Sequence, residues 1–86
     1  MVYLTLDDDE LHLIKQHFPE LFRKVQKYLV GYDLVVNSER EYDVLDDAFT
    51  NDIYKNAAVG GSNYEWTDEE WWLEDIYIRV PEYVDD

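Results

Sequence analysis

The chain has 86 residues, of which 21 are acidic and 7 are basic, so its formal net charge is −14 at pH 7. It contains no cysteine, which excludes disulfides and thiolate metal sites. Hydrophobic residues make up 47% of the sequence and aromatic residues 16%, enough to build a core and too many for a disordered chain. We expect one small domain over residues 1–86. A cytoplasmic location is expected, because no apolar run approaches a membrane span and no signal-peptide pattern is visible.

The N-terminal third predicts a strand followed by a helix. Residues 2–6 read VYLTL, a short β-branched and aromatic run that is typical of strands. Apolar residues then recur at helical spacing, which predicts a helix over about residues 8–29. Asp7 and Glu10 have the spacing of a capping box, which favours a helix start at this point.

Pro19 falls inside this apolar stripe. An interior proline removes one backbone hydrogen bond and clashes with the preceding turn, so we expect a kink near Phe18. The alternative is two helices, with Pro19 at the first position of the second. Gly31 suits the stop of the helical segment.

The middle of the chain predicts a second strand and a second helix. Residues 32–36 read YDLVV and predict the strand. Ser38 and Glu41 have capping-box spacing, and the apolar stripe after them predicts a helix over residues 38–56. The sequence VGGSN, which follows, predicts a flexible loop.

The last third contains all three tryptophans and predicts a third helix, over residues 67–80, with a capping box at Thr67 and Glu70. Residues 76–80 also alternate in a way that is compatible with a strand. Two interpretations of Trp71 and Trp72 stay open. Both rings pack in the core, or part of the aromatic face remains available to a partner while the rest of the helix presents carboxylates.

Together these elements predict a mainly helical α+β fold. Three helices pack against one another and against a two-stranded β element formed by residues 2–6 and 32–36. An all-α three-helix bundle is the alternative.

The sequence contains no pattern that indicates an enzyme, a metal site or a cofactor. His12 and His17 are five residues apart, so on a helix they do not share a face and are poor joint metal ligands. No phosphate-binding loop, nucleophile elbow or Ser-His-Asp set can be assembled. We therefore expect no catalytic activity.

The charge is distributed unevenly along the chain. Residues 1–38 hold six acidic and four basic residues, whereas residues 39–86 hold fifteen acidic and three basic residues. A small domain needs a net charge of only about 2–8 for solubility, and self-repulsion beyond that destabilises it. A positively charged partner would explain the excess. Adaptation to high salt is the other explanation.

Two helices are expected to present the carboxylates. On the second, Glu39, Asp43, Asp46 and Asp47 lie three or four residues apart and are expected on the solvent face. A spacing of four residues is about 6 Å along a helix, the same order as the spacing of phosphates along a nucleic-acid strand. Exposed aromatic residues beside them would add interface energy. The predicted partner-binding residues are Glu39, Asp43, Asp46, Asp47, Asp52, Tyr54, Trp66, Asp68, Glu69, Glu70, Trp71, Glu74 and Asp75.

In size, acidity, aromatic content and lack of cysteine, the chain resembles the phage-encoded inhibitors of restriction enzymes, CRISPR effectors and uracil-DNA glycosylase. The resemblance is one of composition over the whole chain, and no residue motif accompanies it. It implies an acidic anti-defence inhibitor that blocks a basic nucleic-acid-binding protein or nuclease by mimicking nucleic-acid charge, in the host cytoplasm if phage-encoded.

Two alternatives remain. The acidic immunity proteins of nuclease bacteriocins are similar in size, acidity and use of tyrosine, which implies an immunity protein or antitoxin against one toxic nuclease. The other alternative is an acidic accessory or oligomerisation module, and a homodimer is left open. Direct binding to nucleic acid or to an anionic membrane is not expected at this charge.

Overall fold

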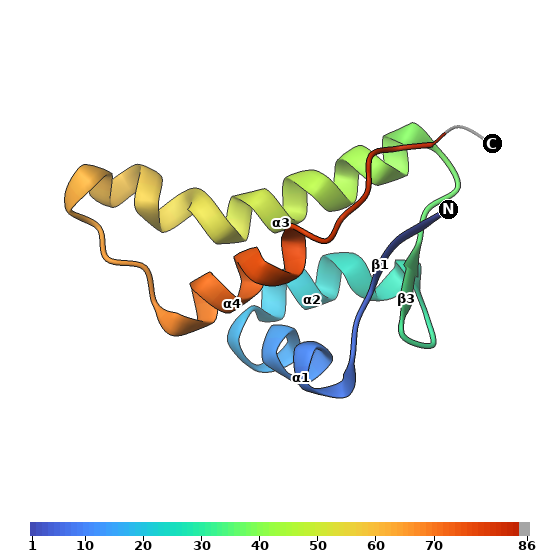
Figure 1. Ribbon diagram of the computed structural model, residues 1–86, viewed down its shortest axis with the longest axis horizontal. Helices are drawn as coiled ribbons and strands as arrows, with labels where there is room; N and C mark the ends of the chain where they lie inside the picture. The colour runs from blue at the N-terminus through green and yellow to red at the C-terminus, as the bar shows by residue number, and fades with distance from the viewer. Residues whose placement is uncertain (85–86) are drawn as a thin grey trace.

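The computed structural model describes residues 1–84, and over this range the chain forms four α-helices and a three-stranded sheet (Figure 1). The fold is mixed α+β and mostly helical, which is the fold class predicted from the sequence. In chain order the elements are β1 (Val2–Thr5), α1 (Asp8–His17), α2 (Pro19–Val25), a 3-10 turn (Gln26–Tyr28), β2 (Leu29–Val30), β3 (Asp33–Val35), α3 (Glu39–Gly60), a second 3-10 turn (Gly61–Asn63) and α4 (Asp68–Tyr77).

The longest helix, α3, sets the shape of the molecule. Its 22 residues extend about 33 Å, and the molecule measures 42 × 25 × 20 Å. Figure 1 shows the shorter helices and the sheet arranged along one side of α3, with the sheet near its start and α4 running back beneath it. The chain therefore returns from the far end of α3, and α4 packs against the middle of that helix.

The single helix predicted over residues 8–29 is wrong, and the alternative of two helices is confirmed. Helix α1 ends at His17, and α2 begins with Pro19 at its first position. Phe18 between them has φ −132° and ψ 61°, outside the helical region, because a residue before proline is sterically disfavoured there.

The predicted two-stranded element is also wrong, because the sheet has three strands in the order β1-β3-β2, with both pairs antiparallel. Strand β2 begins at Leu29, where the predicted helix was expected to end, and continues to Val30. Gly31 does not end a helix. It has φ +64° in the tight turn between β2 and β3, a conformation that favours glycine.

The ends of the last two helices differ from the prediction. Helix α3 continues to Gly60, four residues further than predicted, and Gly61 with φ +66° follows it. Helix α4 ends at Tyr77, and residues 78–84 form neither a helix nor a strand. Instead this segment passes β1, where the Arg79 guanidinium donates to the Thr5 carbonyl at 3.4 Å.

Two of the three predicted capping boxes, those beginning at Asp7 and Thr67, form in full. At the third, the Ser38 hydroxyl accepts the Glu41 amide at 3.2 Å, as expected. However, the Glu41 carboxylate accepts the Asn37 amide at 2.6 Å and does not return to Ser38. All three predicted helix starts are nevertheless found.

The core lies between α3, the sheet and the shorter helices. Its largest fully buried side chains come from every helix and from two strands, so one core holds the chain together. They are Tyr3, Phe49, Ile14, Leu21, Leu34, Leu45, Ile53, Leu73, Ile76, Val25 and Val36.

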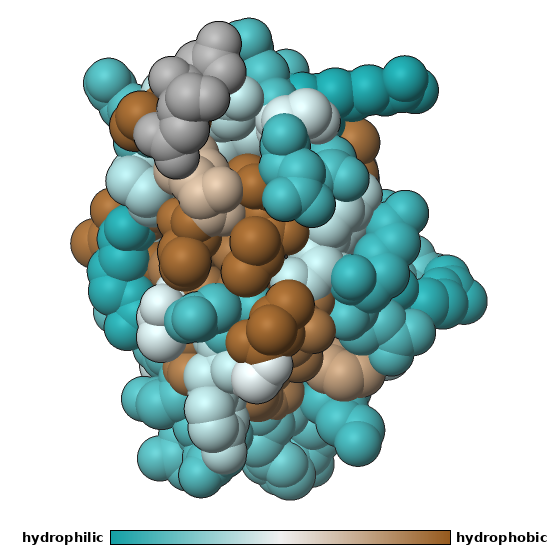
Figure 2. Space-filling model, turned by 90° about the vertical axis from the view of Figure 1, so that its right-hand side faces the viewer, coloured by the Kyte–Doolittle hydropathy of each residue, from teal (hydrophilic) through white to brown (hydrophobic). Residues whose placement is uncertain are grey.

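The end of the molecule that carries the sheet also shows apolar side chains at its surface (Figure 2). Val2 on β1 and Val30 on β2 are among the exposed residues of the strands. Strand β2 is short and lies at the edge of the sheet. The predicted partner-binding aromatic residues belong to other elements: Tyr54 to α3, Trp66 to the connection between α3 and α4, and Trp71 to α4.

Candidate functional site

Three aromatic side chains from different parts of the chain meet at the surface of α3 and α4. We call Tyr54, Trp66 and Trp71 the aromatic cluster. The Tyr54 and Trp66 ring centroids are 5.5 Å apart with the planes at 68°, and the Trp66 and Trp71 centroids are 4.7 Å apart at 33°. Tyr54 is 41% exposed and Trp71 53%, whereas Trp66 is half-buried against the core. The structure thus brings together all three predicted partner-binding aromatic residues.

The interpretation that Trp71 and Trp72 are core residues is wrong. Helix α4 directs Leu73 and Ile76 into the core, where both are almost fully buried. At about 100° per residue, Trp71 lies on the opposite side of α4 from this face, whereas Trp72, four residues before Ile76, lies at its border. Trp72 is 42% exposed and Ile78 68% exposed, although neither was among the predicted partner-binding residues. The spacing of Ile78, five residues after Leu73 and two after Ile76, places it outside the buried face and was the available signal, whereas Trp72 had no such signal.

Three carboxylates of α3 form a line on the solvent side. We call Glu39, Asp43 and Asp47, all exposed and each four residues apart, the acidic row. A step of four residues advances about 6 Å along the helix, so the row is about 12 Å long. It is shorter than predicted, because Asp46 and Asp52 turn inward.

Asp46 is half-buried and directed at core tyrosines, so the prediction that it lies on the solvent face is wrong. Its Oδ1 accepts the Tyr77 hydroxyl at 2.8 Å and the Tyr3 hydroxyl at 3.2 Å. Burial, and then the nearby Asp46 carboxylate, raise the pKa of both phenols, which stay protonated as donors. Asp46 therefore stabilises the contact between β1, α3 and α4.

Asp52 and Glu70 are also held inside the protein. Asp52 is 5% exposed and lies 3.5 Å from the Lys55 amine. Glu70 is 4% exposed, and its Oε1 accepts the Thr67 amide at 2.9 Å and the Tyr64 hydroxyl. Burial by itself raises the Glu70 pKa, but these hydrogen bonds outweigh it and the pKa lies below its ordinary value. Both carboxylates are thus committed to contacts within the chain.

The other predicted carboxylates of α4 remain accessible. Asp68 and Asp75 are exposed, and Glu69 and Glu74 are half-buried. Asp68 lies three residues before Trp71 and Asp75 four residues after it, so both share its helix face.

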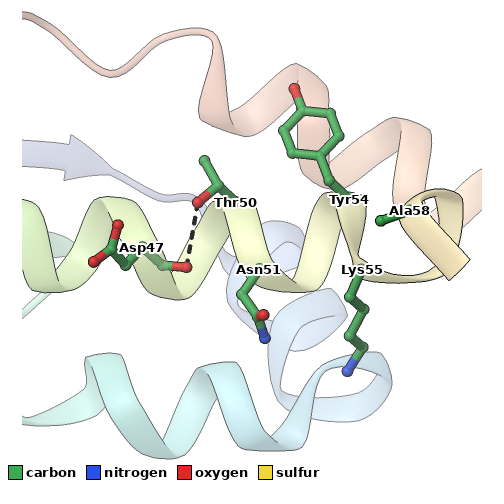
Figure 3. Close-up of a pocket in the computed structure, with 6 residues that line it drawn as sticks. All are labelled: Asp47, Thr50, Asn51, Tyr54, Lys55 and Ala58. Carbon is green, nitrogen blue, oxygen red and sulfur yellow. Dashed lines mark hydrogen bonds between the residues drawn. The ribbon is translucent and has the colours of Figure 1, made fainter.

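A shallow hollow of about 490 Å³ joins the two features along α3 (Figure 3). Asp47, the last residue of the acidic row, and Tyr54, the first of the aromatic cluster, both line it. Figure 3 shows Tyr54 projecting from one flank of α3, while Asn51 and Lys55 project from the other. The acidic row and the aromatic cluster therefore form one continuous surface.

The charge changes sign on the other flank of α3. Helix α2 and the 3-10 turn after it carry Arg23, Lys24 and Lys27, all exposed. Lys24 and Asp47 line the same hollow between α2 and α3. Because these bases lie on the α2 side, a cationic partner is attracted most strongly to the α3 and α4 side.

No group of three or more histidine, aspartate and glutamate side chains within residues 1–84 is placed to hold a metal ion. None of the helices in this range combines the length and apolar character needed to cross a bilayer. Comparisons of the chain with protein-family models, with curated proteins and with solved structures find no match.

Proposed function

We propose that this protein is an acidic inhibitor of the kind found in phages. It binds a basic nucleic-acid-binding protein or nuclease of a defence system and occupies the surface that nucleic acid would otherwise occupy. The observation that carries this proposal is the continuous surface on which the acidic row meets the aromatic cluster, joined through Asp47 and Tyr54. On this proposal the protein has no catalytic activity and acts in the cytoplasm.

The acidic row supports the electrostatic part of this function. Its three exposed carboxylates follow one another at a spacing of the same order as that of phosphates in a nucleic-acid strand. A row about 12 Å long matches only a few phosphates. Its charges therefore attract and steer the partner but do not by themselves give high affinity. Asp68 and Asp75 on α4 extend the negative surface beside the aromatic cluster.

The aromatic cluster supports specific recognition of the partner. Large, partly exposed aromatic side chains in a packed group are the residues that dominate binding energies at protein interfaces. Their carboxylate neighbours act as the polar rim that surrounds such hot spots. The partner is thus recognised by contact as well as by charge.

A second candidate function is that of an immunity protein or antitoxin that neutralises one toxic nuclease. The compactness of the aromatic cluster favours it, because a single hot-spot cluster suits one dedicated partner. The two functions differ in salt dependence. A complex held mainly by the acidic row dissociates as salt rises, whereas one held mainly by the aromatic cluster withstands it.

The test is capture of a partner from bacterial lysate with the purified protein as bait. One variant bait carries Glu39→Lys, Asp43→Lys and Asp47→Lys. A control bait carries three reversals at exposed residues of α1 and α2, away from the proposed surface, and so has the same net charge. These are Asp8→Lys, Asp9→Lys and Glu20→Lys.

We expect the unmodified protein and the control to retain the same basic nucleic-acid-binding protein at low salt, and the row variant to lose it. Retention of nothing basic at low salt would contradict the proposal. Equal capture by the row variant and the control would show that α3 is not the contact surface.

A further inference from the structure

We infer that the aromatic cluster is a stacking platform for an arginine side chain of the partner, and that it discriminates arginine from lysine. This inference rests on the proposed function for the positive charge of the partner. It adds the residue type that the partner must present and the ring on which that residue lies.

The rings of the cluster pack directly on one another and do not form a cage. Trp66 and Trp71 have ring centroids 4.7 Å apart, which leaves no room for a cation between them. Tyr54 meets Trp66 at 68°, as an edge contact. Trp71 is the most exposed ring of the cluster, at 53%. A partly exposed indole ring suits a planar guanidinium, whereas a compact ammonium gains less from a flat ring.

Two carboxylates lie beside Trp71, where they can accept hydrogen bonds from the edge of a guanidinium that stacks on this ring. Asp68 and Asp75 flank Trp71 on the same side of α4, and both are exposed. A guanidinium that stacks on the ring keeps its N–H donors in its own plane, pointing outward to such carboxylates. Lysine has no planar fork of donors and cannot make both contacts in this way.

No cation within residues 1–84 is placed over this ring. In the described part of the chain, the cation–π contacts are those of Lys15 with Phe22 and of Lys27 with Tyr28, away from the cluster. The ion pairs in the same range likewise leave Asp68 and Asp75 without a basic residue within 4.0 Å. The ring face and its acidic border are both available to a partner.

Charge also determines which kind of partner this surface attracts. A second copy of this chain brings another net charge of −14, and a nucleobase brings its phosphate, so both are repelled. An arginine in a basic protein segment is attracted by the field and fits the ring. The structure therefore favours an arginine-bearing protein partner over self-association or direct nucleic-acid binding.

The test uses two labelled probes, hexa-arginine and hexa-lysine, both capped at their ends. Their binding to the purified protein is measured by fluorescence anisotropy at physiological salt. The two peptides carry the same charge, so electrostatic attraction alone gives them equal affinity. We expect hexa-arginine to bind roughly five- to tenfold more tightly, with quenching of tryptophan fluorescence.

Two matched variants locate the effect. Trp71→Leu removes the indole face and keeps a good helix former of apolar character at an exposed position, so the fold is retained. It should abolish the preference and leave the two peptides with equal affinity. Trp72→Leu makes the same change at the neighbouring exposed tryptophan and should keep the preference. Circular dichroism confirms that both variants are folded.

Equal affinity of the two peptides for the unmodified protein, or a preference that survives Trp71→Leu, would overturn the inference. Its failure is distinguishable from failure of the proposed function. If the lysate experiment captures a basic nucleic-acid-binding protein but the peptides show no arginine preference, the proposed function is supported and the arginine inference is contradicted. An arginine preference without any captured nucleic-acid-binding protein supports the platform and contradicts the inhibitor.

Discussion

Asp43 and Asp46 lie three residues apart on α3, yet the structure assigns them opposite effects on stability. Asp43 is exposed, whereas Asp46 accepts hydrogen bonds from Tyr77 at 2.8 Å and from Tyr3 at 3.2 Å. Tyr3 is fully buried, so its hydroxyl has no access to water when Asp46 is removed. We predict that Asp46→Lys destabilises the protein strongly and that Asp43→Lys does not.

The magnitude follows from the two hydrogen bonds. A hydrogen bond to a charged group contributes about 1.5–3 kcal/mol, and the longer bond to Tyr3 lies at the low end. Because Asp46 is half-buried, we assign about 3–4 kcal/mol of the free energy of unfolding to the two hydrogen bonds together. A domain of this size has a free energy of unfolding of roughly 4–13 kcal/mol. The melting temperature should therefore fall by about 12–30 °C.

The assay is thermal unfolding of both variants and of Asp46→Asn, followed by circular dichroism. Asp43→Lys is the matched control, because both reversals reduce the self-repulsion of the chain by the same amount. We expect it to melt at or slightly above the unmodified protein, and Asp46→Asn to fall between the two. If Asp46→Lys melted within a few degrees of Asp43→Lys, the Asp46–tyrosine contacts would not stabilise the fold and this reasoning would be refuted.

Three further predictions concern the ends of α4 and its tail. The Glu70 pKa lies below its ordinary value of 4.5, so this group stabilises the fold above that pH and the contribution is lost as pH falls through the folded pKa. Urea unfolding between about pH 3 and pH 6 should show a steeper loss for the unmodified protein than for Glu70→Gln, and parallel curves would contradict it. Thr67→Ala removes the N-cap acceptor and should cost about 1 kcal/mol in the free energy of unfolding, whereas Thr67→Ser should cost little; equal losses would argue against the cap. Arg79→Ala leaves the buried Glu10 carboxylate without its guanidinium at 2.9 Å and should cost about 1–2 kcal/mol, an expectation refuted by unchanged urea unfolding.

Local signals in the sequence predict the parts of the fold that depend on a few neighbouring residues. The capping boxes at Asp7 and Thr67 locate two helix starts, because the contacts that make them lie within one turn. Strand β2 could not be found in the same way. It has two residues and exists only through pairing with β3, which periodicity does not detect. Gly31 was predicted to end a helix, but it lies in the turn that joins β2 and β3.

The candidate site was predicted in part for a similar reason. Exposed positions such as Asp43 and Asp47 follow from the apolar stripe of α3. That helix contacts α2 on one flank and α4 on another, so its buried face is wider than a single stripe and includes Asp52. The aromatic cluster depends on the return of the chain from α3 to α4, which no local pattern specifies.

The central claim is that the protein and nucleic acid compete for one surface of a basic partner. The direct test is titration of this protein into a complex of the captured partner with labelled nucleic acid, followed by fluorescence anisotropy. We predict that the anisotropy falls to that of the free nucleic acid at stoichiometric amounts, and that the Glu39, Asp43 and Asp47 reversals prevent this. A ternary complex, in which the partner holds both the nucleic acid and this protein, would contradict the account.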